Sequence, residues 1–519
     1  MSLFARKNVD QLQSEAAAGQ GLRRVLGKWD LTALGIGAVI GAGIFATTGS
    51  AIAGGADHIG AGPAIVLSFA LTAVACGFAA LCYAEFAAMI PVSGSAYTYS
   101  YAALGELVAW IIGWDLIIEY AIGNVAVAIS WSGHLVELLR IVGLELPAWL
   151  ATDYRTAYQA AERLAQGAAD PATQYLGSAV AAAPHLFGLP VIVNIPAVLI
   201  VAAVTVILVY GIRESATSNT AMVMLKVGII LFFIAVGAMF IKPSNYTAHG
   251  GFAPNGWGGI TSAAAIIFFA YIGFDAVSTA AEESKNPQKD MPFGIIASLI
   301  ICTVLYILVA LVMTGMTPWN QLDTPEPMLT ALGGASGSPR LLGVARFIVA
   351  LGAVVAMTSV LLVFQLGQPR IFFSMARDGL LPGWAAKIHP KFRTPYIPTI
   401  VTGVFVAVFA AFANIDEAVQ LTNIGTLFAF VLVAAGVLVL RAKEPGRERP
   451  FRVWGSPVTP LIAIVSCGYL MIKLPAVTWV RFGVWLAIGA VLYFSYGYRH
   501  SRLRPAGGQT GRRADGQAG

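Results

Sequence analysis

Three stretches of the sequence place polar chemistry inside apolar segments. Residues 35–45 read GIGAVIGAGIF, with four glycines in eleven positions, and residues 268–279 read FFAYIGFDAVST. Lys226 lies in the apolar run NTAMVMLKVGIILFFI. Glycine weakens a helix by roughly 1 kcal/mol relative to alanine, so the first stretch predicts an interrupted helix. Burial disfavours the charged form of an ammonium group, so Lys226 is a candidate for binding and releasing a proton.

An interrupted membrane helix offers bare peptide groups to a ligand. The N-H groups that begin the second half suit a carboxylate, and the carbonyls that end the first half suit an ammonium group. Together they predict a site for the backbone of an α-amino acid. The alternative for Gly37 and Gly41 is a GxxxG pair that packs two helices closely. Nucleotide binding is excluded, because the GxGxxxGxG spacing misses the dinucleotide fingerprint and no strand precedes it.

The two stretches occupy similar depths in their segments. Residues 40–43 lie 11 to 14 positions after Trp29, about 17–21 Å along a helix and near the middle of a bilayer. The stretch FFAYIGFDAVST begins 11 positions after Trp257. Freed backbone at this depth is tolerated only inside protein or beside a cavity. Paired breaks at matching positions of inverted repeats are typical of a transporter substrate site.

The segments that must position these residues are membrane helices. The 519 residues are 57% hydrophobic and 11% charged, whereas soluble domains carry about 25% charge. We expect an all-α polytopic membrane protein with twelve transmembrane helices in one transporter domain, residues 29–499, flanked by tails at 1–28 and 500–519. The twelve apolar segments are 29–53, 62–90, 97–138, 191–211, 217–241, 257–281, 292–316, 341–369, 397–413, 417–440, 457–475 and 480–499.

Basic residues predict the orientation. An even number of spans places both termini on one side, and 23 Lys and Arg lie in segments on that side against 7 on the other. The positive-inside rule therefore predicts cytoplasmic termini, and the absence of an organelle-targeting sequence favours the plasma membrane. The same bias explains the net charge of +6 without nucleic acid. On the opposite side, an insertion at 140–190 predicts a surface helix over the external mouth.

Cysteine spacing gives no metal or disulfide signal. The four cysteines lie in apolar runs without CxxC spacing, so we expect packing roles, no metal and no cofactor. The first 28 residues have no long apolar core, so they do not form a cleavable signal peptide. No HExxH, GxSxG or Walker motif is present, and we therefore expect no enzyme.

Three motifs carry a resemblance to a known family. GIGAVIGAGIF, FFAYIGFDAVSTAAEESKNPQKDMP and MARDGLLP are similar to signatures of the amino acid-polyamine-organocation (APC) superfamily and, within it, the cationic amino acid transporter (CAT) group. The similarity covers about residues 25–500, without the alanine-rich external loop. The resemblance implies a 5+5 inverted repeat (LeuT-like) with discontinuous helices 1 and 6, two further helices, and transport by alternating access.

The resemblance also implies substrate contacts. The substrate carboxylate would meet the amides of Gly41, Ala42 and Gly43. The amino group would meet carbonyls near Ile40, Phe269, Ala270 and Ile272. The chain departs from its relatives at Ala42, where a hydroxyl residue is frequent, so a side-chain contact to the carboxylate is missing there.

Lys226 resembles the coupling group of relatives that do not use sodium. Its ammonium group would contact the broken first helix, and deprotonation would loosen that contact. The alternative is a lysine that snorkels to the interface or locks two helices. Thr358 and Ser359 stand where sodium-coupled relatives place hydroxyl ligands, but the charge of Lys226 opposes a sodium ion, so a proton is the expected coupling ion.

Acidic and bulky side chains complete the predicted pocket. Asp115 and Glu119 are spaced i, i+4 on one helix face, and we assign Glu119 to the pocket; hydrogen bonding to neighbouring helices is its alternative. Asp275 is expected to cap the resumed half-helix. Met357 would narrow the side-chain pocket. Phe268 and Phe269 are candidates for an aromatic gate, with ordinary packing as the alternative.

We therefore expect a permease that carries small neutral L-amino acids such as alanine together with a proton, in the lipid bilayer. The alternative within this class is a uniporter or exchanger of arginine, lysine, ornithine or polyamines, which the family name and Glu119 favour. The alternative from another class is a channel, which predicts an uninterrupted polar pore. The sequence instead offers sparse intramembrane polarity and two interrupted segments.

Overall fold

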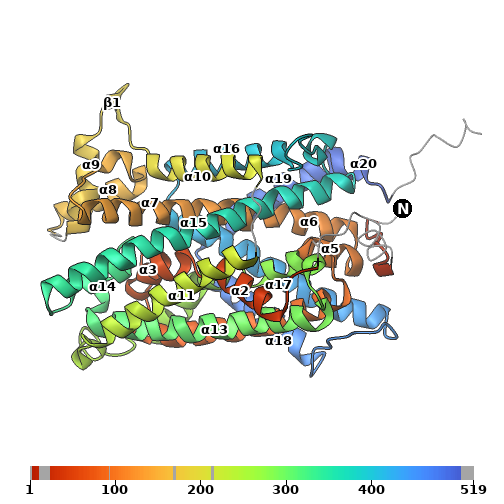
Figure 1. Ribbon diagram of the computed structural model, residues 1–519, viewed down its shortest axis with the longest axis horizontal. Coiled ribbons are helices and arrows are strands. Elements are labelled where there is room, and N and C mark those ends of the chain that lie inside the picture. The colour runs from red at the N-terminus through yellow and green to blue at the C-terminus, as the bar shows by residue number, and fades with distance from the viewer. Residues whose placement is uncertain are drawn as a thin grey trace, which may run out of the picture.

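The protein is an elongated bundle of helices that run along its longest axis (Figure 1). The computed structural model describes residues 3–10, 24–55, 57–92, 94–167, 171–211 and 216–503. The described start of the chain and α20 (Tyr498–His500) lie at one end of the bundle, which we call the N-terminal end. Helices α8 (Tyr154–Ala165) and α9 (Pro171–Ala182) lie at the other, which we call the α8–α9 end.

The remaining elements follow in chain order. The α-helices are α2 (Lys28–Val39), α3 (Thr48–Ala53), α4 (Ile65–Met89), α5 (Ser95–Ala103), α6 (Glu106–Ile117), α7 (Gly123–Ile141), α10 (Ile195–Tyr210), α11 (Ala216–Ala238), α12 (Gly256–Ile267), α13 (Pro287–Met316), α14 (Pro327–Gly334), α15 (Pro339–Arg377), α16 (Tyr396–Phe412), α17 (Ile415–Lys443), α18 (Val458–Lys473) and α19 (Ala476–Leu492). Four π or 3-10 segments matter below: η1 (Gly43–Thr47), η3 (Ile118–Ile122), η6 (Phe268–Tyr271) and η7 (Asp275–Glu283). The short strands β1 (His185–Leu186) and β2 (Leu189–Pro190) form a hairpin.

The helices are long and apolar enough for a multi-pass membrane protein. In the described part of the chain, eight helices meet the length and composition needed to cross a bilayer, or nine if the bent pair Lys28–Val39 and Gly43–Ala53 is one span. Three apolar helices, α10, α16 and α18, are shorter. An α-helix pairs all its backbone groups internally, which is why such segments cross lipid. The count of twelve crossings and the 5+5 repeat stay predictions.

One predicted segment is wrong at its start. Residues 97–138 were expected to form a single apolar span, but α5 ends at Ala103 and α6 begins at Glu106 after a turn. Gly105, with φ +104°, is the N-cap of α6. Only Leu104 and Gly105 lie between the two helices, with no proline and no polar residue, so composition alone does not reveal the turn.

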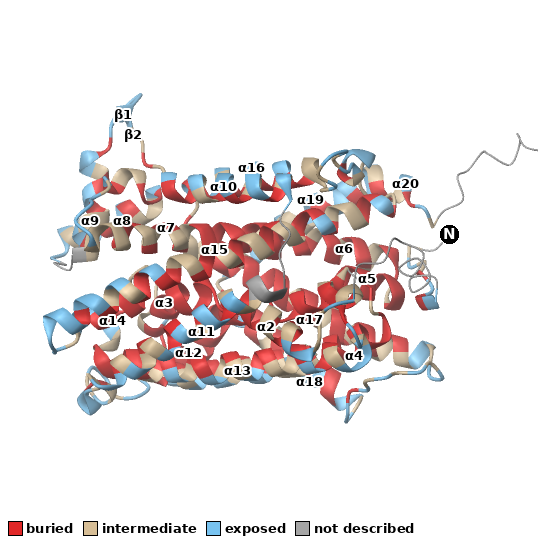
Figure 2. Cartoon of the chain, in the orientation of Figure 1, coloured by how far each residue is buried: buried red, intermediate tan, exposed pale blue. Residues whose placement is uncertain are grey.

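Buried residues lie mainly in the middle of the bundle, while exposed residues lie mainly on its outer faces and at its ends (Figure 2). Helix α13 packs against α4 and α2, α15 against α7, α10 against α16, and α17 against α18. The two interrupted segments, α2–η1–α3 and α12–η6–η7, lie inside this shell. The surrounding long helices therefore isolate the freed backbone of both segments from lipid.

The N-terminal segment packs onto the bundle. Lys7 Nζ lies 2.6 Å from Asp378 Oδ1, and Tyr97 donates its hydroxyl proton to Asp378 Oδ2 at 2.7 Å. The Glu106 amide donates to the carbonyl of Ala5 at 2.9 Å. The described part of the predicted tail 1–28 thus makes buried contacts at the N-terminal end. The predicted C-terminal tail, 500–519, lies outside the described residues from residue 504 onward.

Candidate functional site

The first glycine-rich stretch is a broken helix. Helix α2 ends at Val39, Ile40 is extended with φ −76° and ψ 100°, and η1 begins at Gly43. The two halves are bent by 42°. The first N-H groups after a break have no preceding turn to pair with. The predicted interruption at residues 40–43 is therefore present, at the positions where the substrate carboxylate was expected.

The second stretch is broken as well. After η6, Ile272 is extended with φ −62° and ψ 135°, and η7 begins at Asp275. Gly273 has φ +116°, a conformation that residues with a Cβ rarely adopt. Asn423 of α17 donates its side-chain amide to the carbonyls of Ala265 and Ile266 at 2.8 and 2.9 Å. This side chain pairs backbone groups just before the break.

The two breaks touch each other. A Cβ on Gly43 would lie 2.2 Å from the Cα of Ala270, and a Cβ on Gly273 would lie 2.9 Å from the carbonyl carbon of Ala38. Only glycine permits backbones to approach this closely. The glycines therefore serve close packing as well as interruption, and they bring together the two sets of peptide groups that the sequence predicted at one site.

Lys226 lies at the first break. The side chain is 1% exposed, and its Nζ donates to the carbonyls of Gly37 at 2.6 Å and Ile40 at 3.1 Å. The Ile40 carbonyl, expected near the substrate amino group, thus already accepts from the lysine. Tyr306 of α13 donates its hydroxyl proton to the Val39 carbonyl at 2.9 Å. Carbonyls freed at the end of α2 are therefore paired by side chains from α11 and α13.

Helix α15 forms one wall beside the first break. A Cβ on Gly41 would lie 2.9 Å from Val360 Cγ2, and Met357 lies one turn earlier on the same helix. Met357 is fully buried, and Ser130 of α7 donates its hydroxyl proton to Met357 Sδ at 3.0 Å. Phe268 packs against Phe430, with ring centroids 5.7 Å apart. These contacts place apolar groups around the breaks, which suits an aliphatic side chain.

Glu119 lies beside another acid. It sits in η3, buried, with its carboxyl group next to that of Asp275. In the part of the chain that the structure describes, Glu119 Oε2 and both carboxyl oxygens of Asp275 have no hydrogen-bond partner. Lys226 bonds to the backbone carbonyls of the first break and not to the carboxyl group of Glu119. The expected cap by Asp275 is wrong, because Phe274 is the N-cap of η7 and no side chain caps it.

A hollow at the α8–α9 end leads toward the breaks. We call it the vestibule; its lining includes Ala46 and Thr47, three and four residues after Gly43. Further lining residues are Ser50, Asp57, His58, Arg155, Arg163, Asp323, Asp416 and Gln420. A small solute in the vestibule is thus about one helical turn from the first break.

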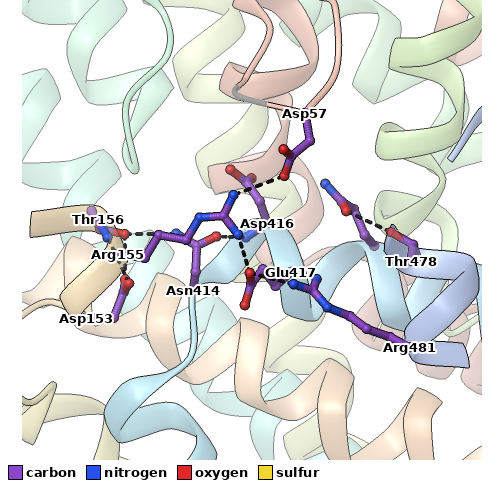
Figure 3. A network of polar contacts seen from close by, with 10 residues as sticks. Asp57, Asp153, Arg155, Thr156, Asn414, Asp416, Glu417, Thr478 and Arg481 are labelled. Atoms are coloured by element: carbon purple, nitrogen blue, oxygen red, sulfur yellow. Dashed lines mark hydrogen bonds and ion pairs between the residues drawn. The ribbon is translucent and has the colours of Figure 1, made fainter. Parts of the chain in front are cut away.

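Ion pairs hold α8 across the vestibule, where the sequence predicted a surface helix. Figure 3 shows Arg155 between two carboxylates, Asp57 at 3.1 Å and Glu417 of α17. Arg481 contacts the same Glu417 at 2.7 Å. Two turns later on α8, Arg163 contacts Asp323 at 2.6 Å. These residues have no predicted role, because ion pairs between residues this far apart in sequence leave no local pattern.

We expect α8 to restrict access to the vestibule. Exposed ion pairs contribute roughly 0.2–1 kcal/mol each. Loss of three pairs in the variant Arg155→Gln/Arg163→Gln should raise the labelling rate of Ser50→Cys, in the vestibule wall, about three- to tenfold. The measurement uses an impermeant thiol reagent on the α8–α9 side, since the four native cysteines are buried. Arg340→Gln, exposed on α15, is the control; an unchanged rate in the double variant would contradict the role of α8.

Glu326 predicts a pH-dependent stability. It is the N-cap residue of α14, outside the long helices, and burial followed by the charge of Glu137 raises its pKa to about 8, against an opposing effect of Arg140. An acid with a pKa raised by folding stabilises the fold below its unfolded pKa and loses that contribution as pH rises. We therefore expect the melting temperature to fall as pH rises from 4.5 to about 8.

The substitution Glu326→Gln should flatten this part of the profile, because glutamine has no proton to lose. Thermal unfolding of the purified protein across this pH range measures the effect. Glu162→Gln, exposed on α8, is the matched control and should leave the profile as in the parent protein. A parent-like fall of the melting temperature in Glu326→Gln would assign the pH dependence to another group.

Comparison with known proteins decides the family. The sequence model described as amino acid permease matches residues 26–494. The chain belongs to the amino acid permease family. This family is part of the APC superfamily, as the three motifs indicated. The protein is thus a transporter of the multi-pass membrane class, and its relatives are permeases and transporters rather than enzymes.

Three relatives of this permease carry names with different substrates. It is 45% identical to the branched-chain amino acid permease BcaP of Bacillus subtilis (strain 168), and 43% identical to the methylthioribose transporter of the same organism. Each alignment covers 97% of this chain and 99% of the relative. It is 35% identical to the vacuolar cationic amino acid transporter 4 of Arabidopsis thaliana, over 86% of this chain and 68% of the relative.

Proposed function

We propose that this permease carries small neutral L-amino acids such as alanine together with a proton, by alternating access. The observation that carries the proposal is the contact between two broken helices, with a buried lysine on the carbonyls of one of them. A zwitterion presents a carboxylate and an ammonium group at a fixed short separation. Two adjacent breaks supply N-H groups and carbonyls for both ends of the zwitterion without any charged side chain.

The substrate contacts belong to this proposal. The carboxylate binds the amides of Gly41, Ala42 and Gly43, since these residues lie between the break and the first position of the second half. The amino group binds carbonyls of the second break, near Phe269, Ala270 and Ile272. The carbonyl of Ile40 accepts from Lys226 in this conformation, and its second lone pair can accept from the substrate amino group. Glu119 and Met357 border the side chain of the substrate.

The position of Lys226 supports proton coupling. The protonated ammonium group bridges α11 to the end of α2 through Gly37 and Ile40. A neutral amine is a poorer donor, so loss of the proton weakens the connection to the first broken helix. Proton binding and release at one residue can thereby favour one of the two orientations of that helix. With the termini in the cytoplasm, the vestibule faces the outside of the plasma membrane.

A second candidate is a branched-chain amino acid permease. The relative with 45% identity over almost the full length of both chains carries that name. The apolar surroundings of Met357 and Val360 suit a branched side chain as well as a methyl group. Methylthioribose is a weaker candidate despite the 43% relative, because it has neither a carboxylate nor an ammonium group for the breaks to bind.

A substrate screen in proteoliposomes tests the proposal. Uptake of labelled alanine, valine, leucine, arginine, putrescine and methylthioribose is measured with and without an imposed pH gradient. The proposal expects accumulation of alanine that requires the gradient, and saturation at high substrate concentration. Accumulation of arginine or putrescine alone would establish the exchanger alternative. Conductance without saturation would establish a channel.

Met357 should set the size limit of the pocket. In Met357→Ala we expect the leucine-to-alanine uptake ratio to rise about tenfold, since one to three kcal/mol is typical for fitting extra methylenes. The ratio is measured as kcat/KM for each substrate in the same proteoliposomes. Val363→Ala, on the same helix and only partly buried, is the control. An unchanged ratio in Met357→Ala would remove Met357 from the side-chain pocket.

A further inference from the structure

The hairpin β1–β2 carries an unusual apolar tip. Leu186 is 60% exposed, Phe187 97% and Leu189 66%. The turn between the strands consists of Phe187 and Gly188, with φ +54° and +81°. The segment Leu186–Leu189 has no charged residue, although the α8 part of the same insertion carries several. Three large apolar side chains are therefore mostly exposed at the end of a loop, and Phe187 is almost fully exposed.

The turn conformation makes Phe187 a costly choice in water. A two-residue hairpin turn with positive φ at both positions favours Asn-Gly, because bulky residues rarely adopt positive φ. The chain has phenylalanine at the position where asparagine would fit best. Neither the backbone nor the contacts within the protein favour an aromatic ring here. A favourable environment for this ring must come from outside the chain.

The hairpin stands beside apolar helix faces. Its base is held by hydrogen bonds from the Val193 amide to the Trp149 carbonyl, and from the Asn194 amide to the Ala411 carbonyl at the end of α16. Helix α10 begins one residue later. In Figure 1 the hairpin projects sideways past the row of α10 and α16, at the α8–α9 end. Phe412 of α16 is 60% exposed, next to Ala411.

The faces of α10 and α16 are the kind that contact acyl chains. Both helices are apolar in composition, and many of their outward side chains are large and exposed. These residues are Leu199, Val206, Ile207, Val404, Val408, Phe409 and Phe412. The hairpin tip continues this apolar surface at the level where the helices end. Phenylalanine and leucine are typical of the apolar face of segments that lie in the bilayer interface.

We propose that the β1–β2 tip inserts into the lipid interface beside α10 and α16, and that it anchors the helices α8 and α9 to the bilayer. The tip contacts the phospholipid leaflet at the α8–α9 end, at the boundary of headgroups and acyl chains. Burial of Leu186, Phe187 and Leu189 in that boundary removes their apolar surface from water. The anchor rests on the exposed apolar tip and on the helix faces beside it, so it holds whichever substrate the permease carries.

Fluorescence quenching in proteoliposomes tests this placement. The variant Leu189→Cys keeps Phe187 and receives an environment-sensitive thiol fluorophore; the native cysteines are buried and remain unlabelled. Quenching is measured with a phospholipid that carries a nitroxide near its headgroup, and with aqueous iodide. Leu199→Cys, on the outward face of α10, is the lipid reference. Ser178→Cys, exposed on α9 in the same insertion, is the aqueous reference.

We expect the label at 189 to be quenched by the nitroxide lipid about as strongly as the label at 199, and at least about threefold more than the label at 178. Adding Phe187→Asn, which suits the turn and keeps the hairpin, should shift the label at 189 toward iodide quenching. Two results would overturn the anchor. One is equal iodide quenching at 189 and 178. The other is a label at 189 that neither quencher reaches, together with cross-linking between two copies of the protein. That result would mean that the tip contacts a second chain and not lipid.

Discussion

Replacing Lys226 with methionine should abolish proton-driven accumulation while exchange across the membrane continues. Methionine has a similar length and no charge, so the carbonyls of Gly37 and Ile40 lose their donor. A buried acceptor without a partner costs about 1–3 kcal/mol. We expect gradient-driven uptake of the best substrate to fall by about tenfold or more, since each 1.4 kcal/mol is a factor of ten, and to become independent of pH.

Counterflow of labelled substrate separates this effect from misfolding. In Lys226→Met, counterflow should persist, because it needs substrate binding and alternation but no net proton movement. Lys242→Met is the matched control: Lys242 lies after α11, outside the bundle, and bonds to the Ser336 hydroxyl. It should accumulate substrate as the parent does. Undiminished proton-driven accumulation in Lys226→Met would end the assignment of the coupling proton to this residue.

Replacing Gly43 with alanine should disable the permease. The new Cβ would stand 2.2 Å from the Cα and 2.7 Å from the Cβ of Ala270, which are fixed in η6 and unable to rotate away. Overpacking in a tight interior costs about 1–3 kcal/mol, and relief requires the two broken helices to separate. We expect substrate uptake to fall by about tenfold or more, together with a lower melting temperature.

Gly228→Ala is the matched control for this substitution. Gly228 lies in α11, and no described heavy atom stands within 4 Å of the position of its added Cβ. Alanine favours a helix over glycine by roughly 1 kcal/mol, so this variant should transport normally and unfold no earlier than the parent. Normal uptake in Gly43→Ala would show that the two breaks do not need their present separation.

Much of the site was predictable because it is local in sequence. The glycine-rich stretch at 35–45 and the glycine followed by an acid at 273–275 both mark places where the chain leaves a helix, as the structure shows at Ile40 and Ile272. Lys226 is conspicuous in the sequence because a lysine between methionines and isoleucines is rare in lipid. These signals depend on neighbouring residues alone, so one sequence was enough to find them.

Several features were not predictable, since they depend on residues far apart in the chain. The role of Asp275 as a helix cap was wrong, because the carboxyl group faces Glu119 of η3 instead. The pairing of freed carbonyls by Tyr306 and Asn423 was not foreseen. The same holds for Arg155 between Asp57 and Glu417. Each of these contacts spans about a hundred residues or more of sequence, and local composition does not encode such a partner.

The sequence by itself determined that this protein is a membrane bundle with two interrupted helices and a buried lysine, because apolar runs and glycines act on the chain where they stand. Only the tertiary structure decided that the interruptions meet at Gly43 and Ala270, and that Lys226 bonds to the first of them. The physical reason is that contact between two distant segments depends on how the helix surfaces pack. Which backbone approaches which is fixed by the shape of all the helices together.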